Sequence, residues 1–370
     1  MIINISDEEF KRIFEDTQFH LPLRWHNIDF ADTLRLLFDT YLFRLEQCDM
    51  CSNRYESVSY DNSEIYAVCS LLVSVVRHYS NGFPSKAFCT FKRLMRILER
   101  TPLKTYEKSI KEQFAIRNYR DSLNLYRVTC VNDNTPYGRK RVFHTPYYLR
   151  SKVSTNRYSI AGFPSLYLGT SLELCCEEVH YNPHEQFALA SKFQIERNYE
   201  YNNTEIKVIE LAIKPQDFLT EENHNDFYKK TRLFPEGLLN KASLRSAYLL
   251  WYPLIAACSF IRVNKKDPFA AEYIIPQLLM QWVRLQLESS SRESRQLIGI
   301  RYFSCASEKA SDMGFNYVFP ASGSQTHNSF CPILTNAFKL TRLYYIHEYN
   351  DIYACEMALK NDDHLSGVDE

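Results

Sequence analysis

The stretch Arg157–Glu178 constrains the fold of this chain more than any other part of the sequence. It consists of RYSIAGFPSLYLGTSLELCCEE. Gly162 and Pro164 interrupt the chain before a short apolar run, which is the pattern of a loop followed by a buried strand. Thr170, with Glu173 three residues later, is typical of the N-terminus of a helix. The stretch therefore predicts a loop, a strand and a capped helix in direct succession.

The helix of this stretch has an apolar stripe at the spacing of one helical face. Its members are Leu172, Cys175, Cys176 and Val179. On a helical wheel Glu178 lies nearer to this stripe than Glu177, so we expect Glu178 to reach a cleft beside the strand and Glu177 to point further into solvent. The alternative is that Glu178 is one more surface carboxylate. Both cysteines are predicted to be buried core side chains, because no histidine or other base beside them would activate a thiol.

Several short motifs resemble those of the RES domain family. The turn Asn156-Arg157-Tyr158, the strand Leu166-Tyr167-Leu168 and the helix end Cys175-Cys176-Glu177-Glu178 match in order. An early strand with a further arginine fits Leu125-Tyr126-Arg127-Val128, and a late serine segment fits Gly299-Ile300-Arg301-Tyr302-Phe303-Ser304. A family-like ending follows at Asn316-Tyr317-Val318-Phe319, so order and spacing agree from about residue 120 to residue 325.

This resemblance implies a fold related to the ADP-ribosyltransferases and an activity on NAD+. Characterised members split off nicotinamide by hydrolysis or phosphorolysis, or pass ADP-ribose to a protein, and many are toxins of bacterial toxin–antitoxin pairs. Carried over by position, Glu178, Arg127 and Ser304 are the expected catalytic residues. Arg157, Tyr167 and Arg127 are the expected NAD+-binding residues, and an antitoxin protein is the expected partner of a toxin.

The chain also departs from the family pattern. Phe303 stands where many members have proline, and the turn reads NRYSIAG instead of GRFNPPG. Two alternatives to hydrolysis or phosphorolysis of NAD+ stay open. One is a protein ADP-ribosyltransferase on the same fold, and the other is an inactive RES-like protein used for interaction. The acceptor of the ADP-ribose group, whether water, phosphate or protein, is also left open.

The residue types fit the cleavage of NAD+. Nicotinamide leaves as a neutral ring, so no acid is needed to protonate it, whereas ordinary glycosidases use two carboxylates. Glu178 would favour the positive charge that develops on the ribose. Arg127 and Arg157 would donate to the diphosphate, and Tyr167 would offer a flat face to the ribose or nicotinamide. Ser304 would form hydrogen bonds at the nicotinamide end or near the strand that supports Glu178.

Composition narrows the classes of partner. The chain has 44 basic and 44 acidic residues, so no broad field attracts nucleic acid or an anionic membrane. Its N-terminus, MIINISDEEF, has no apolar run of a signal peptide. The longest apolar stretch, Ala247–Ile261, is too short and too interrupted for a membrane span. We therefore expect a cytoplasmic protein without nucleic-acid or membrane partners.

The 11 cysteines favour free thiols in a reducing compartment. Cys48 and Cys51 have a metal-like spacing, and Cys69 and Cys89 would complete a structural zinc site only if the N-terminal helices folded back on each other. Buried thiols are the favoured interpretation, so neither a metal nor a resident cofactor is predicted. His144, which lies in a turn before a proline, is expected to be structural and a neighbour of the site.

The hydrophobic periodicity predicts an α+β protein. Residues 1–115 form a helical N-terminal accessory domain, with helices at Asp29–Gln47, Ser63–Tyr79 and Pro84–Glu99, and we expect it to serve regulation or homo-oligomerisation. Residues 116–355 form a predicted mixed twisted sheet with a helical insert at Asn240–Arg262 and Ile275–Leu287, and the resemblance to RES domains implies that this is an NAD-binding catalytic domain of ADP-ribosyltransferase-like type. Residues 356–370 are predicted to be a polar acidic tail. The predicted strands are Leu125–Thr129, Ser165–Leu168, Ala188–Ile195, Lys207–Ile213, Leu297–Phe303, Phe315–Phe319 and Leu340–Ile346.

Overall fold

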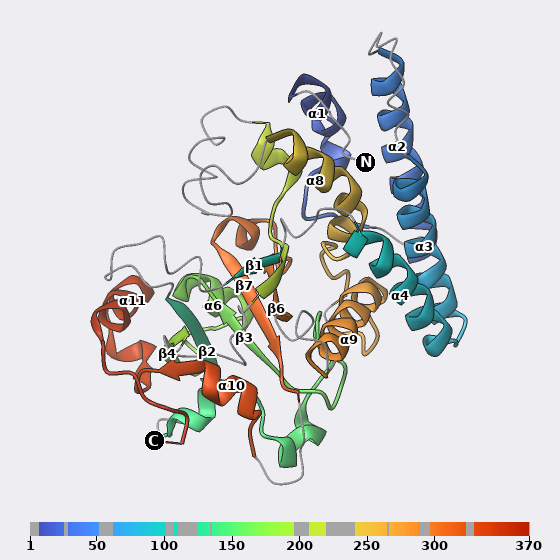
Figure 1. Ribbon diagram of the computed structural model, residues 1–370. Helices are drawn as coiled ribbons and strands as arrows, with labels where there is room; N and C mark the ends of the chain where they lie inside the picture. Colours follow the sequence, from blue (N-terminus) through green and yellow to red (C-terminus); the bar gives the residue numbers. More distant parts are fainter. Residues whose placement is uncertain are drawn as a thin grey trace. The chain divides into compact units, whose positions relative to one another are not determined.

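The chain forms two compact units in the computed structural model (Figure 1). The first comprises Met1–Glu107 and Ile213–Trp282, and the second comprises Lys108–Ala212 and Val283–Glu370. The structure describes residues 7–25, 29–51, 62–100, 107–109, 124–133, 135–195, 207–219, 241–264, 266–288, 297–322 and 329–369.

The first unit is helical. Its α-helices are α1 (Asp7–Phe14), α2 (Phe30–Cys51), α3 (Asn62–Ser80), α4 (Pro84–Arg100) and α8 (Lys241–Ala257), and α9 (Ile274–Glu288) begins in it. Short 3-10 turns lie at Thr17–Phe19, Pro215–Phe218 and Ala271–Tyr273. The helices predicted over residues 29–99 are confirmed to within a few residues. Among the described residues, none of the helices combines the length and the apolar character that a membrane crossing requires.

An aromatic core joins α8 to the N-terminal helices. The Phe14 and Tyr252 rings lie 5.0 Å apart, and the Tyr41 and Tyr252 rings lie 4.8 Å apart. Their hydroxyls stay satisfied, because Tyr252 donates to the carbonyl oxygen of Phe19 and Tyr41 donates to that of Leu249. The helical segment predicted as an insert of the catalytic domain is therefore grouped with the N-terminal helices. This grouping does not follow from the position of the segment in the sequence.

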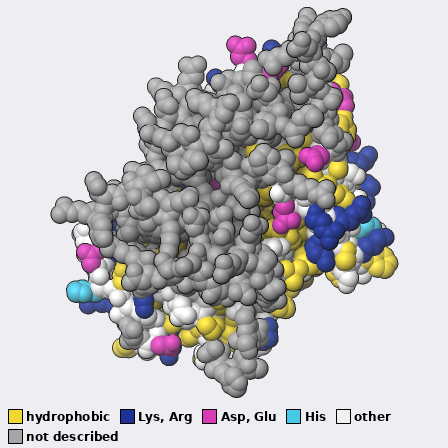
Figure 2. All heavy atoms as spheres, viewed as in Figure 1, with side chains coloured by type: hydrophobic (Ala, Val, Ile, Leu, Met, Phe, Trp, Pro, Cys, Tyr) yellow, Lys and Arg dark blue, Asp and Glu magenta, His cyan; other side chains and the backbone are white. Residues whose placement is uncertain are grey.

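One face of α4 is basic. Lys86, Arg93 and Arg96 are exposed at helical spacing, and Lys and Arg side chains gather over this part of the surface in Figure 2. The opposite face of the helix is buried through Phe91, Leu94 and other apolar side chains, in the amphipathic pattern of a surface helix. A local cationic surface therefore exists although the charge of the whole chain is balanced.

The second unit is built on one mixed sheet in the order β1-β5-β6-β7-β3-β2-β4-β8, with β9 paired to β4. Strands β5 and β6 are parallel, whereas the pairs β6–β7, β7–β3, β3–β2, β2–β4 and β4–β8 are antiparallel. The strands are β1 (Glu107–Ser109), β2 (Leu125–Val131), β3 (Ser165–Gly169), β4 (Phe187–Ile195), β5 (Lys207–Leu211), β6 (Leu297–Phe303), β7 (Phe315–Pro320), β8 (Phe338–Leu340) and β9 (Tyr344–Tyr345). The α+β class and the mixed sheet are confirmed.

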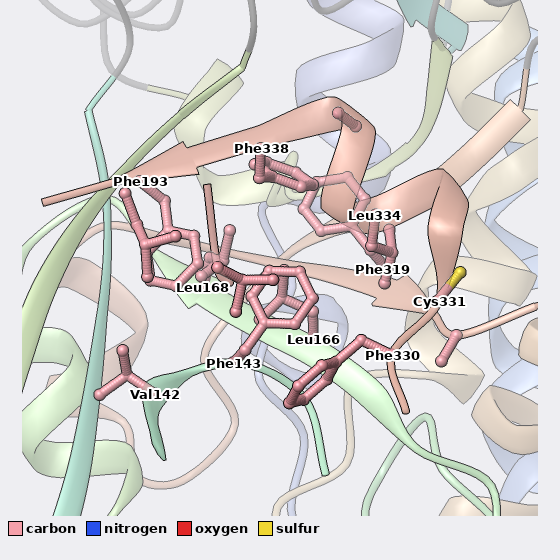
Figure 3. Close-up of a cluster of buried hydrophobic side chains, with 14 of the residues drawn as sticks. Val142, Phe143, Leu166, Leu168, Phe193, Phe319, Phe330, Cys331, Leu334 and Phe338 are labelled. Atoms are coloured by element: carbon pink, nitrogen blue, oxygen red, sulfur yellow. The ribbon is translucent and has the colours of Figure 1, made fainter. Parts of the chain in front are cut away.

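Each face of the sheet is covered by its own hydrophobic core. On one face Leu166, Leu168 and Phe319 pack with Phe143 and Phe338 (Figure 3). The second core gathers Tyr126 and Val128 of β2 with residues of α6 (Leu172–Glu178) and α11 (Ile352–Asn361). Burial on both faces explains why β3 is a continuous apolar run and does not alternate with polar residues. The remaining helices are α10 (Pro332–Ala337) and 3-10 turns at Arg139–Val142, Tyr147–Lys152, Lys309–Asp312 and Ile346–Glu348.

A buried ion pair crosses the parallel strands β5 and β6. Arg301 and Glu210 are register partners, and Arg301 Nη1 lies 2.8 Å from Glu210 Oε2. Both side chains are almost fully buried, and the Arg301 guanidinium also lies 4.0 Å from the centre of the Phe315 ring. Loss of one partner would leave the other charge buried and uncompensated, so the pair fixes this register.

The predicted polar tail is wrong for most of its length. Helix α11 extends through Asn361 and buries Cys355 and Leu359, and Val368 is also buried. Leu340 and Ser366 exchange two backbone hydrogen bonds. The apolar residues of this segment are too widely spaced among acidic residues to form a periodic signal, but Leu359 and Val368 each belong to one of the two cores of the sheet.

Candidate functional site

Arg127 lies where β2 separates from β3. The two strands pair at Tyr126 and Gly169 alone among the described residues, whereas β2 follows β4 over seven register positions. Arg127 Nη1 donates to the backbone carbonyl oxygen of Tyr167 at 3.2 Å. Because side chains alternate along a strand, the Arg127 side chain leaves β2 on the sheet face opposite to Tyr126. It reaches the backbone of β3 at the point where the two strands separate.

The Arg127 guanidinium is a desolvated cation on a partly buried side chain. Within the described part of the chain no carboxylate pairs with it, and its Nε is buried without a hydrogen-bond acceptor. Burial lowers the pKa of Arg127 from 12.5 to about 10, partly offset by Cys175 and Tyr167. A desolvated cation of this kind costs stability, and a bound anion would compensate it.

Arg157 and Tyr167 are positioned by a tight turn. Asn156 and Ser159 exchange two backbone hydrogen bonds, which places Arg157 and Tyr158 at the tip of a two-residue hairpin. Arg157 is 9% exposed and Tyr158 is 1% exposed, so this tip is folded inwards. The Ser159 and Tyr167 hydroxyls lie 2.8 Å apart. The turn that resembles the family motif is thereby attached directly to the Tyr167 phenol.

Helix α6 follows β3 after one turn. Its cap is Ser171, whose side chain accepts from the Leu174 amide at 3.2 Å. The predicted cap, Thr170, is wrong because its hydroxyl accepts from the Phe315 amide and is bound to β7 instead. Gly169 lets the helix approach the strand, since a Cβ at this position would lie 2.7 Å from Cys175 Sγ.

Glu178 is the last residue of α6 and hydrogen-bonds to β7. Asn316, which is 5% exposed, donates its Nδ2 to Glu178 Oε1 at 2.5 Å. The expected order of exposure of the two glutamates is wrong: Glu178 is exposed and Glu177 is half-buried. Helix α6 ends at Glu178, so a helical wheel does not predict the direction of this side chain. Glu177 is half-buried because its carboxylate accepts a hydrogen bond from the Ser307 hydroxyl. The Glu178 carboxylate therefore combines solvent access with a fixed donor from the sheet.

Three of the predicted residues, Arg157, Tyr167 and Glu178, act on the Tyr302 hydroxyl. Burial raises the pKa of Tyr302 well above its ordinary value, and Glu178, Tyr167 and Tyr158 raise it further, whereas the Arg157 guanidinium lowers it. The Tyr158 and Tyr302 rings lie 4.7 Å apart. The Glu178 carboxylate, the Arg157 guanidinium and the Tyr167 phenol, all from the stretch 157–178, therefore lie close enough to act on the pKa of Tyr302.

The sheet register explains this convergence. Asn316 on β7 pairs with Tyr302 on β6 and with Gly169 on β3. Tyr167 lies two residues from Gly169, and therefore on the same face of the sheet as Tyr302 and Asn316. Sequence reasoning assigned no role to Tyr302 or Asn316, although both lie within the quoted motifs. The register of β6 against β7, which is not visible in one sequence, is the information that was missing.

Ser304 bonds within a local turn. It is fully buried just beyond β6, and its hydroxyl accepts from the Ala306 amide at 3.1 Å. This local turn fixes the end of the strand that contains Tyr302. This hydrogen bond supports a role of Ser304 in fixing the end of β6 more directly than it supports a contact of Ser304 with a ligand.

His144 is a structural histidine, as expected. It is fully buried, its Nε2 accepts from the Cys331 amide at 2.9 Å, and its Nδ1 lies 2.8 Å from the carbonyl oxygen of Thr145. Burial lowers the pKa of His144 to about 4, and the cations Arg127 and Arg284 lower it further. The ring is therefore neutral at pH 7, with its proton on Nδ1.

The cysteines of α6 are core residues, as predicted. Cys175 and Cys176 are 7% and 5% exposed and belong to the core formed with α11. Burial raises the pKa of Cys175, and it raises that of Cys176 to about 12. Neither sulfur is therefore a thiolate at neutral pH.

The zinc hypothesis rests partly on residues that the structure does not describe. Cys48 and Cys69 are buried and Cys89 is exposed, while the side chain of Cys51 lies outside the described residues. Among the described side chains there is no group of three or more metal-ligating residues that could hold an ion.

Fold and site define an α+β protein whose mixed sheet gathers a carboxylate, one arginine and tyrosines around Tyr302, with Arg127 at the separation of β2 and β3. Comparison with known proteins finds similarity to "Putative toxin YopC" of Bacillus subtilis (strain 168), with 28% identity over 313 residues. The match covers 82% of this chain and 63% of that protein, so the chain spans less than two thirds of the length of this relative. No family model matches the chain, and no solved structure matches it.

Proposed function

We propose that this protein cleaves the bond between nicotinamide and ribose in NAD+. The observation that supports this most strongly is the grouping of the Glu178 carboxylate, the Tyr167 phenol and the Arg157 guanidinium around Tyr302. These are the groups that an anionic dinucleotide with a developing ribose cation requires. The proposal includes an ADP-ribosyltransferase-like arrangement of the sheet and the motif resemblance to RES domains.

The two arginines would bind the diphosphate of NAD+. Arg127 is suited to this because its buried charge has no acidic partner among the described residues, and a diphosphate would supply the missing negative charge. Arg157 would approach from the inward-folded hairpin tip. Guanidinium groups bind phosphate oxygens in pairs, which a lysine cannot do. Tyr167 would pack its ring against the ribose or the nicotinamide.

Glu178 would act on the ribose. The nicotinamide–ribose bond breaks with its electron pair moving to the ring nitrogen, which neutralises the nicotinamide and leaves positive charge on the ribose. The Glu178 side chain, held by Asn316, would stabilise this charge. A water oxygen then bonds to the anomeric carbon and releases one proton, which gives ADP-ribose. Phosphate would replace water if the reaction were a phosphorolysis.

The similarity to the toxin-named YopC supports a further proposal, that NAD+ loss makes this protein toxic to the cell that contains it. An antitoxin would then be the partner that suppresses activity, and the cytoplasm would be the site of action. The N-terminal helices would provide an assembly surface. Each of these is a proposal about the whole protein, because the chain covers 63% of that relative.

Product analysis separates the two enzymatic hypotheses. Purified protein is incubated with NAD+ labelled in the adenosine part, with and without phosphate and with a cell extract. Cleavage gives free nicotinamide with labelled ADP-ribose or its 1-phosphate, and no labelled protein. Label on a protein of the extract would favour the ADP-ribosyltransferase alternative. No nicotinamide release under any of these conditions would leave the interaction hypothesis.

A further inference from the structure

An exposed phenylalanine is held in place between two arginines just before β3. Phe163 is 45% exposed although it is a large apolar side chain. Arg150 Cζ lies 5.5 Å from the centre of its ring and Arg284 Cζ lies 5.7 Å from it. Both distances lie within the range of a cation–π interaction, so the two guanidinium groups lie beside the ring. The ring is therefore surrounded by positive charge and still presents surface to solvent.

The backbone on both sides of Phe163 is fixed. Arg150 Nε donates to the carbonyl oxygen of Gly162 at 3.1 Å, and Arg284 Nη2 donates to that of Pro164 at 2.9 Å. Phe163 closes a four-residue turn by donating to the Ile160 carbonyl oxygen, and Gly162 takes the positive φ of 83° that this turn requires. Burial does not explain why two arginines hold a ring that remains exposed. A rigid aromatic surface for a ligand does.

We propose that Phe163 is the platform on which the adenine ring of the dinucleotide stacks. This inference rests on the proposed function, because it places the second base of the same NAD+ molecule. Phe163 precedes Tyr167 by four residues, which is about 13 Å along an extended chain. An extended ribose–diphosphate–ribose bridge covers such a span, with Tyr167 at the nicotinamide end and Arg127, which contacts the Tyr167 backbone, beside the diphosphate.

Charge favours an adenine nucleotide over an uncharged aromatic ligand. Stacking on phenylalanine is available to any flat ring, but Arg150 and Arg284 add positive charge beside it. An adenylate group supplies both a flat base and a phosphate, so it uses both features. Smaller substrates without the adenylate half, such as nicotinamide mononucleotide, would leave Phe163 unused.

Calorimetric measurement of ADP-ribose binding tests whether adenine stacks on Phe163, and it does not require catalysis. We expect Phe163→Leu to weaken ADP-ribose binding by about 5- to 150-fold, the range found for loss of one base stack. Phe163→Trp should retain binding, and ribose 5-phosphate should bind both variants like the wild type. Tyr353→Leu, which replaces an aromatic residue that is 69% exposed on α11, is the matched control and should change nothing.

Three outcomes would overturn the assignment. They are equal ADP-ribose binding by Phe163→Leu and wild type, equal weakening of ribose 5-phosphate, and absence of ADP-ribose binding by the wild type. A thermal unfolding midpoint of Phe163→Leu close to that of the wild type shows that the variant is folded. Failure of the proposed function has a different signature: binding of ADP-ribose that depends on Phe163, without release of nicotinamide from NAD+.

Discussion

Replacing Arg127 by methionine should make the folded protein more stable. It should also abolish the rise of the unfolding midpoint that ADP-ribose causes. The pKa of Arg127 falls from 12.5 to about 10 because the guanidinium is desolvated. Each pH unit corresponds to about 1.4 kcal/mol, so the buried charge costs the folded state about 3 kcal/mol at pH 7. The penalty disappears only as the pH rises above about 10. Arg127→Met removes this penalty but also loses the hydrogen bond to the Tyr167 carbonyl, which lowers the stability gain by about 1 kcal/mol.

Arg127→Met should therefore raise the free energy of unfolding by about 1–2 kcal/mol, measured by urea denaturation. ADP-ribose should raise the unfolding midpoint of the wild type, since it binds the native state alone, and should not raise that of the variant. Arg141→Met, at an exposed position, is the matched control and should change stability by less than about 0.5 kcal/mol. A destabilised Arg127→Met protein that still responded to ADP-ribose would refute both parts of the reasoning.

Three more variants test other parts of the site. The free energy of unfolding of the wild type should fall by about 2 kcal/mol between pH 7.5 and pH 5, because His144 is buried in its neutral form and binds a proton only near pH 4. His144→Gln should remove most of this pH dependence, as measured by urea denaturation. Asn316→Ala should lower kcat roughly 10- to 100-fold with little change in KM, because the donor to Glu178 is lost; an unchanged kcat would remove Asn316 from the site. Gly169→Ala should lower both the thermal midpoint and kcat, because its Cβ would displace Cys175 and helix α6 with it; a variant with normal stability and activity would contradict this.

Much of the secondary structure could be predicted from the sequence because its periodic signals are strong. The helices over residues 29–99 and the strands β2, β3, β4, β6 and β7 agree with the structure to within a few residues. Short elements such as α10 and β9 offer too few residues for a period to appear. The assignment of 241–257 to the N-terminal helices depends on contacts of Tyr252 with Phe14 that no local pattern encodes.

The candidate site was predicted in part. Residue types and order indicated Arg157, Tyr167 and Glu178, which the structure brings together around Tyr302. Ser304 matched a motif, yet its hydroxyl is used in a local turn. The relative exposure of Glu177 and Glu178 depends on where α6 ends, and a helical wheel assumes that the helix continues. Asn316 required the register of β7, which follows from tertiary packing.

The most direct test of the central claim is the rate of nicotinamide release from NAD+ by the wild type, Glu178→Gln and Glu177→Gln. Glutamine retains an oxygen that accepts from Asn316, so Glu178→Gln removes the charge and preserves the fold. We expect the wild type to release nicotinamide, Glu177→Gln to keep nearly the full rate, and Glu178→Gln to be slower by about 100-fold or more. Equal rates for Glu178→Gln and the wild type would contradict the assignment of Glu178 as the residue that stabilises the ribose cation.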